Sequence, residues 1–283
     1  MKKYFQIKVW AFALAIVATF SFSSCKKEAV DKPVDDNPVE ANVVTGTAVD
    51  EQGKPLAGVK VRAENPSGYN IFTEGTTDAN GKYKLKLSSI GGWKIYAWKQ
   101  VEYQGKTYNL RLGMKADADY DAFSTDDKTV VKDFVWKLSG RIPDRSTSAD
   151  YGMGYFGASL YFVNLNDGLK MPAGTKVTVT LTPENGATYL DGTPATTTVT
   201  KSFTIGGGDN YYIGDIKVSS YTMRLQSELN GTIKTVRIGV NSVLGNYYES
   251  LSELYWDPHT LSTGSYESGI KTGTSISFYM KQY

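Results

Sequence analysis

The chain has 283 residues, enough for two domains that each bury a core without cross-links. Its formal charge is only +2, without a basic run, which excludes the electrostatic footprint of a nucleic-acid-binding protein. A single histidine, His259, and a single cysteine, Cys25, exclude multi-histidine metal sites and an intramolecular disulfide. We therefore expect no cofactor. The 20 tyrosines favour strands over helices.

The first 24 residues have the pattern of a signal peptide. Met1–Lys8 is basic, and Val9–Phe20 is an apolar run too short to span a bilayer. The small residues before Cys25 resemble a bacterial lipoprotein processing site, which implies a diacylglycerol on the Cys25 thiol. The alternative is a secreted protein with an unmodified cysteine. Removal of residues 1–24 leaves 28 basic and 29 acidic side chains, so the mature chain is close to neutral.

Residues 25–41 follow as a charged segment that contains prolines and lacks aromatic residues. This composition predicts a disordered, lipidated tether. The Cys25-Lys26-Lys27 sequence is similar to that of Bacteroidetes-type lipoproteins. We expect a cell-envelope protein held by its lipid in the outer membrane, facing either the periplasm or the cell surface.

Short alternating segments separated by turns predict a β-sandwich over residues 42–130. Tyr83, Leu85 and Leu87 alternate with lysines, so one face of that strand is apolar and the other faces water. Asp78-Ala79-Asn80-Gly81, just before it, is typical of a tight hairpin turn.

These turns and strands carry motifs that resemble the carboxypeptidase regulatory-like domain, a transthyretin-like (prealbumin-like) sandwich. The motifs are Gly46-x-x-x-Asp50, Gly53-x-Pro55-Leu56-x-Gly58-Val59-x-Val61 and Thr77-Asp78-x-x-Gly81-x-Tyr83-x-Leu85. The resemblance covers about residues 42–115. It implies structural roles for the motif residues and an accessory domain that serves as a spacer or binding module, without peptidase activity.

Aromatic residues beyond these motifs suggest a glycan platform in two parts of the sequence. Rings on one face of the Trp93–Trp98 strand, with Tyr103 and Tyr108 nearby, could stack on sugar rings, and Tyr255 and Trp256 could rim a ligand groove. The candidates are Trp93, Trp98, Tyr103, Tyr108, Tyr255 and Trp256. The alternative, which the tendency of aromatic side chains to be buried favours, is that these rings pack inside the sandwiches or cap their ends.

Three further patterns suggest chemistry less specifically. Asp117, Asp119 and Asp121 have the alternate spacing of a calcium loop, but Gly and Glu are missing from its sixth and twelfth positions. His259 after Asp257-Pro258 lacks a nucleophile elbow that would complete a triad. Glu249 and Glu253 are a carboxylate pair without other support. A solvated loop and surface side chains are the simpler interpretations.

Residues 131–283 predict a second antiparallel sandwich of the transthyretin or Ig-like kind. Thr175–Leu181 alternates strictly, and turn signals recur every eight to twelve residues. Strands are expected at 158–163, 175–181, 196–205, 211–218, 221–225, 232–240 and 275–280. The order of strands from Val177 to Tyr221 faintly resembles that of the first domain.

The function expected from these features is that of a non-enzymatic envelope lipoprotein, acting as a binding or scaffold module. Its partners would be the membrane, through Cys25, and an envelope protein or a glycan. The alternative is a carbohydrate-binding lipoprotein of a polysaccharide-uptake system. A hydrolase is the least supported hypothesis, because the sequence offers no nucleophile or metal constellation.

Overall fold

The computed structural model describes residues 40–126, 128–144, 154–164, 170–240, 246–252, 254, 256 and 273–282. Within these residues the chain is almost entirely β-strand, and its only helix is one 3-10 turn, η1 (Asp117–Tyr120). None of the described segments is a helix with the length and apolarity to cross a membrane. The predicted all-β fold with two sandwiches is confirmed.

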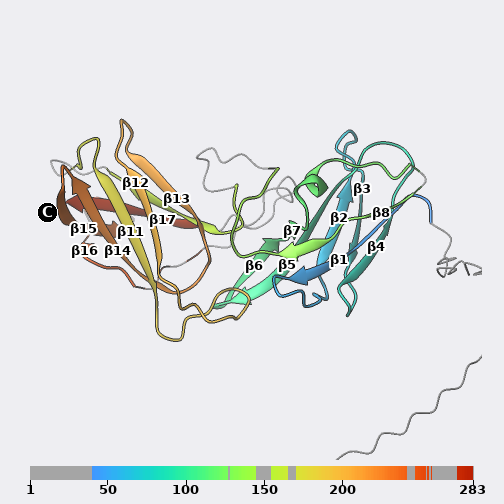
Figure 1. The fold of residues 1–283 in the computed structure, drawn as a ribbon, viewed down its shortest axis with the longest axis horizontal. Helices are drawn as coiled ribbons and strands as arrows, with labels where there is room; N and C mark the ends of the chain where they lie inside the picture. Colours follow the sequence, from blue (N-terminus) through green and yellow to red (C-terminus); the bar gives the residue numbers. More distant parts are fainter. Residues whose placement is uncertain are drawn as a thin grey trace, which may run out of the picture. The chain divides into compact units, whose positions relative to one another are not determined.

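The first sandwich is built from two sheets (Figure 1). One sheet has the order β4-β1-β9-β7, with β8 also paired to β1, and the other has the order β3-β2-β5-β6. The strands are β1 (Val43–Asp50), β2 (Lys60–Glu64), β3 (Phe72–Thr76), β4 (Lys82–Lys86), β5 (Lys94–Tyr103), β6 (Lys106–Arg111), β7 (Gly113–Met114), β8 (Thr129–Val131) and β9 (Phe134–Trp136).

The alternation predicted for the lysine-rich strand is confirmed in β4. Tyr83 and Leu85 are buried while the three lysines are exposed. The expected hairpin before it is wrong, because β3 pairs with β2 and β4 pairs with β1 in the other sheet. The Asp78–Gly81 turn therefore carries the chain between sheets, and the Asp78 carboxylate accepts the backbone N–H groups of Asn80 and Lys82 at 2.8 Å.

A close approach of strands explains one motif glycine. A Cβ on Gly46 would lie 1.8 Å from the carbonyl oxygen of Lys132, so only glycine fits there. The same carbonyl accepts a 2.6 Å hydrogen bond from the buried hydroxyl of Tyr83. Burial raises the pKa of Tyr83. Gly46 and Tyr83 thus allow Lys132, just before β9, to pack closely against β1.

The strand ladder of the first sandwich continues to Trp136, because β8 and β9 run parallel to β1. β8 spans the boundary predicted at residue 130, and β9 lies just beyond it. A strand of only three residues is not stable in isolation, so β9 belongs to the first sandwich, whose sheet it joins.

The second sandwich is one curled sheet with the order β12-β11-β14-β15-β17-β10-β13, with β16 paired to β15 (Figure 1). Its outermost strands meet, because Phe203 of β12 stacks on Tyr211 of β13 at 5.0 Å. Most pairs are antiparallel, but β10 and β17 are parallel. The strands are β10 (Ala158–Val163), β11 (Lys176–Pro183), β12 (Val199–Thr204), β13 (Asn210–Ile216), β14 (Tyr221–Leu229), β15 (Thr232–Val240), β16 (Tyr247–Tyr248) and β17 (Gly273–Gln282).

Candidate functional site at the junction of the two sandwiches

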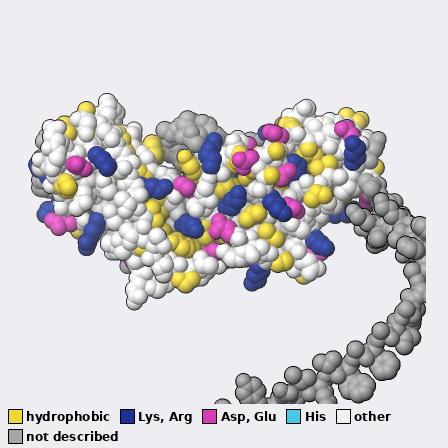
Figure 2. Space-filling model, in the orientation of Figure 1, with side chains coloured by type: hydrophobic (Ala, Val, Ile, Leu, Met, Phe, Trp, Pro, Cys, Tyr) yellow, Lys and Arg dark blue, Asp and Glu magenta, His cyan; other side chains and the backbone are white. Residues whose placement is uncertain are grey.

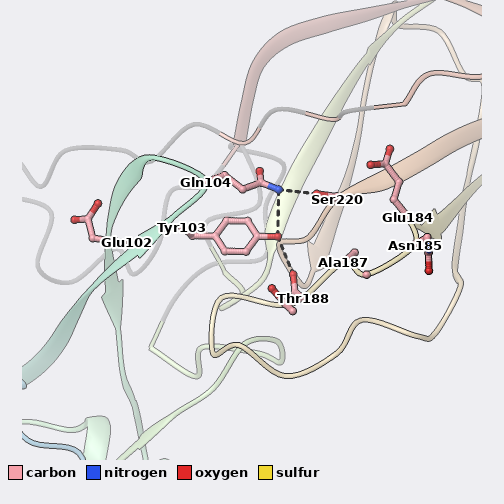
Figure 3. Close-up of a pocket in the computed structure, with 9 residues that line it drawn as sticks. Glu102, Tyr103, Gln104, Glu184, Asn185, Ala187, Thr188 and Ser220 are labelled. Atoms are coloured by element: carbon pink, nitrogen blue, oxygen red, sulfur yellow. Dashed lines mark hydrogen bonds between the residues drawn. The ribbon is translucent and has the colours of Figure 1, made fainter.

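The turn between β5 and β6 is a tight two-residue hairpin loop that reaches the second sandwich. Gln104 and Gly105 both have positive φ, +49° and +72°, as the mirror-image turns of hairpins require. The cost of this backbone conformation for Gln104 is offset at its side chain, because its amide donates a 2.6 Å hydrogen bond to the Ser220 hydroxyl (Figure 3). The end of the hairpin is thus hydrogen-bonded to the second sandwich.

Three further donors of the same hairpin bond to backbone carbonyls of the second sandwich. The Tyr103 hydroxyl donates to Thr188 at 2.7 Å (Figure 3). The Lys106 ammonium and the Tyr108 hydroxyl donate to the carbonyl of Trp256 at 2.9 and 3.0 Å. A carbonyl oxygen has two lone pairs, so both donors can be satisfied at once.

Trp256 is held from its other side by the second sandwich. Its indole N–H donates to the Ser219 carbonyl at 2.7 Å, and its ring meets the edge of Tyr221 at 6.4 Å. The Tyr221 hydroxyl donates in turn to the backbone carbonyl of Lys217, four residues upstream, which is the geometry of a tyrosine corner. Burial raises the pKa of Tyr221. Trp256 therefore joins the hairpin to the β13–β14 connection.

A second set of contacts surrounds the segment between the sandwiches. The backbone N–H of Gly140 donates to the Asp215 carboxylate at 2.7 Å. Phe156 is fully buried, and a Cβ on Gly113 would lie 2.8 Å from its ring, so β7 carries glycine where this ring packs. Val39–Tyr283 forms one compact unit.

Beside the hairpin lies an open groove of about 390 Å³. Its lining is polar, and it combines two carboxylates with amide and hydroxyl groups. The lining residues are Glu102, Tyr103, Gln104, Glu184, Asn185, Gly186, Ala187, Thr188 and Ser220. Figure 3 shows Tyr103 and Gln104 directed towards Thr188 and Ser220, so their polar atoms bridge the two walls. The groove offers hydrogen-bonding groups to a polar ligand.

A buried cation holds the end of the first sandwich. Arg111 is 4% exposed, and its guanidinium bonds both carboxylate oxygens of Asp144 at 3.2 Å. It also lies over the rings of Tyr96 and Tyr120 at 5.3 and 5.6 Å. Burial raises the pKa of Tyr120. Asp144 lies after the last strand of the first sandwich, so this pair fixes the start of the connecting segment.

The predicted aromatic platform is wrong for four of its six residues. These four are almost wholly buried and cannot offer ring faces to a sugar: Trp93 2%, Trp98 8%, Tyr108 2% and Trp256 1% exposed. The physical reason is that both faces of β5 are covered, and that Trp256 packs under the hairpin. Tyr103 is half-buried and its hydroxyl is used at the junction. Tyr255 lies outside the described residues.

The remaining candidates divide between structural roles and undescribed positions. The Asp119 carboxylate accepts a 3.1 Å bond from the buried ammonium of Lys132, and Asp117 lies with it in η1. Over the described residues, no group of three or more metal-ligating side chains comes together. Cys25, Glu253 and His259 lie outside the described residues. The lipidation of Cys25 therefore stays a prediction.

The sequence analysis selected Tyr103, Tyr108 and Trp256 as ring surfaces but missed their role at the junction, and it missed Gln104, Lys106, Thr188 and Ser220 altogether. Most of the acceptors are backbone carbonyls, which every residue carries, so the sequence contains no signal that marks them. The Gln104-Gly105 pair between alternating segments is a usable turn signal. It could have located the hairpin loop but not its partner.

Comparison with known proteins agrees with this architecture. The chain is an all-β protein of two sandwiches, and residues 43–123 match the family model of the carboxypeptidase regulatory-like domain. The first sandwich therefore carries this domain, as its motifs predicted. The domain itself is non-catalytic. Comparison with curated proteins gave no match.

The solved structures that are similar at low identity include the following three. The streptococcal ancillary pilin is 12% identical, with a TM-score of 0.24, over 83% of this chain and 62% of that one. The shaft pilin SpaA of Lactobacillus rhamnosus GG is 13% identical, with a TM-score of 0.22, over 85% and 97%. The Bacillus anthracis TIE protein is 10% identical, with a TM-score of 0.27, over 86% and 44%. At this level of similarity none of them informs the function of this chain.

Proposed function

We propose that the protein is a non-enzymatic cell-envelope lipoprotein whose two sandwiches act together as a scaffold. The observation that carries the proposal is the junction, where four side chains of one hairpin bond to the second sandwich. A scaffold must transmit position from its anchor to its far end. Bonds that cross between the domains serve that purpose better than a free linker, which leaves domains to move independently.

The non-enzymatic part of the proposal is supported by the roles of the polar side chains. Arg111, Asp119 and Lys132 are engaged in ion pairs that hold loops. The Tyr83 and Tyr221 hydroxyls bond backbone carbonyls. These groups stabilise the fold, and the regulatory-like domain adds no catalytic group of its own.

The proposed location rests on the sequence. Cys25 carries the lipid, residues 1–24 are removed, and the mature protein lies in the outer membrane, facing the periplasm or the surface. Its partners are the membrane and an envelope protein. Figure 2 shows basic and acidic side chains interspersed on the face drawn, which supports a partner other than nucleic acid.

The experiment that tests the anchor is metabolic labelling with a palmitate analogue in the native bacterium. The wild-type chain should take up label and fractionate with the outer membrane. Cys25→Ser should do neither. Val30→Ala, five residues further along, is the matched control and should behave as wild type. Label on the Cys25→Ser chain, or membrane association that survives it, would overturn the proposal.

A second candidate function, glycan binding, is favoured by a polar trough of about 470 Å³ on the second sandwich. It lies over β11, β14 and β15 and is lined by Thr180, Thr182, Arg224, Leu225, Gln226, Thr235, Glu249 and Ser250. Hydroxyl, amide and guanidinium groups are suited to sugar hydroxyls. Beside it, Tyr247 lies against the sheet over Gly239, where a larger residue would crowd its ring.

This candidate is tested by a polysaccharide-binding screen on the purified full chain. Arg224→Ala should abolish any binding through the trough. Lys234→Ala, which removes an exposed cation outside the trough, should leave it unchanged. Binding that is equal in the two variants would exclude the trough, and absence of binding by the wild-type chain would remove the candidate.

A further inference from the structure

One end of the first sandwich presents exposed apolar side chains. Tyr69 is 100% exposed, Ile90 79% and Ile71 48%, and Phe72 beside them is 40% exposed. These four make up more than half of the large exposed hydrophobic side chains among the described residues, which otherwise are Val131, Ile233 and Tyr248. Such a gathering on a small domain indicates an interaction surface. We call Tyr69, Ile71 and Ile90 the apolar tip.

The two loops that carry the apolar tip are ordered by hydrogen bonds through Asn65. Its backbone N–H donates to the Ile71 carbonyl at 2.9 Å, and its carboxamide accepts the N–H of Ser67 at 3.0 Å. The amide group of the same side chain reaches the Ile90 carbonyl at 3.5 Å. A Cβ on Gly91 would lie 2.4 Å from that amide, so the contact requires glycine. The tip is therefore presented on a fixed backbone.

The register of the strands places the apolar tip at the end where the chain enters the sandwich. Val43, the first residue of β1, is paired with Lys86, the last of β4, and Leu87 donates to the Asn42 carbonyl at 2.8 Å. The Ser88–Gly92 loop follows directly. Across the other sheet, Lys94 is paired with Glu64, next to the loop that holds Tyr69 and Ile71. The hairpin that bonds the second sandwich lies at the opposite end of β5.

We propose that the apolar tip inserts into the lipid–water interface of the membrane that holds the anchor. The inference rests on the proposed lipidation of Cys25. Residues 26–39 between that cysteine and the described chain can span at most about 50 Å. The chain enters the sandwich beside the tip, so the tip belongs to the end of the sandwich closest along the chain to the membrane.

The chemistry and size of the tip favour a lipid surface over a protein. Tyrosine is enriched at membrane interfaces, and apolar side chains bury readily at the boundary of the acyl chains. Nearby, Glu40 is paired with both Lys84 and Lys86, so these three charges sum to only +1 at the entry. Three side chains are too few for a stable protein interface, which needs about 1,000 Å². A tethered domain needs little additional affinity, because the anchor supplies a high effective concentration.

The test uses the purified, lipidated full chain in liposomes with nitroxide-labelled lipids. Tyr69→Cys carries an environment-sensitive fluorophore, and Gln52→Cys, in the turn at the opposite end of β1, is the matched control. The acylated Cys25 thiol cannot take the label, and mass spectrometry reports the acyl chains separately. We expect loss of most of the fluorescence at position 69 and little at position 52. In an Ile71→Ser/Ile90→Ser background that unfolds at the wild-type urea concentration, quenching at position 69 should fall to the level of position 52.

Equal, weak quenching at both positions in an acylated chain would overturn the proposed insertion of the apolar tip while leaving the proposed anchor intact. Absence of the acyl chains would overturn the anchor, and the inference with it. Strong quenching at position 69 that survives the double serine substitution would also contradict the inference, because it would show proximity without insertion of the tip.

Discussion

The hydroxyl of Tyr108 donates a 3.0 Å hydrogen bond to the backbone carbonyl of Trp256, which lies 148 residues further along the chain. Both side chains are almost wholly buried. Lys106 donates to the same carbonyl at 2.9 Å. One carbonyl of the second sandwich thus accepts hydrogen bonds from two donors of the first. Removal of both donors would leave this buried acceptor unsatisfied.

The first prediction concerns the close approach at Gly46. Gly46→Ala should lower the free energy of unfolding by about 3 kcal/mol or more, because the added Cβ would lie 1.8 Å from the Lys132 carbonyl oxygen and the backbone must shift. Urea denaturation followed by circular dichroism measures the change. Gly92→Ala, which meets nothing within 4 Å, is the control and should be nearly neutral. Similar losses for both variants would contradict the proposed fit.

The second prediction concerns the buried ion pair of Arg111 and Asp144. Arg111→Met should destabilise the chain by about 3–5 kcal/mol, since it leaves the Asp144 carboxylate without its partner in a largely buried site. Arg237→Met breaks the exposed pair with Glu249 and should cost at most about 1 kcal/mol. Chemical denaturation of the two variants side by side decides the matter. Equal effects would show that burial of the Arg111 pair is unimportant.

The third prediction concerns alkaline pH. Burial raises the pKa of Tyr83 and of Tyr221, whereas in the unfolded chain both ionise near pH 10. The stability that these two groups contribute is therefore fully present below pH 10 and is lost as the pH rises above it. Each should steepen the fall by about 1.4 kcal/mol per pH unit.

This prediction is checked by urea denaturation at pH 8 to 11.5. Tyr83→Phe and Tyr221→Phe should each be less stable at pH 8, by about 1 kcal/mol for the lost hydrogen bond, and each should show a shallower fall above pH 10. Tyr69→Phe, at a fully exposed position, should reproduce the wild-type curve. An unchanged slope in both buried variants would show that these tyrosines do not govern the alkaline transition.

Local patterns in the sequence predicted the strands well where one face is buried. β4 and β11 alternate residue by residue, and this period is a property of the strand itself. The motif glycines and Asp78 also have the expected structural roles. The pairing of β3 and β4 was not predictable in this way, because a tight turn can either close a hairpin or pass between sheets.

Burial of the aromatic residues and the junction could not be predicted from local patterns. A local sequence pattern does not show whether a tryptophan ring will be buried or exposed to a sugar. Trp98 and Trp256 are buried only because distant segments pack over them. Tyr103 and Tyr108 donate to carbonyls 85 and 148 residues away. Such bonds depend on the tertiary fold, and backbone acceptors leave no mark in the sequence.

The most direct test of the proposed scaffold is differential scanning calorimetry of the wild-type chain and of Lys106→Met/Tyr108→Phe, which removes both donors to the Trp256 carbonyl. We predict one cooperative transition for the wild-type chain and two separated transitions for the variant. Thr107→Ala, whose hydroxyl bonds Glu102 within the hairpin, is the control and should keep one transition. Two transitions in the wild-type chain, or one in the double variant, would contradict a scaffold whose two sandwiches are coupled through this junction.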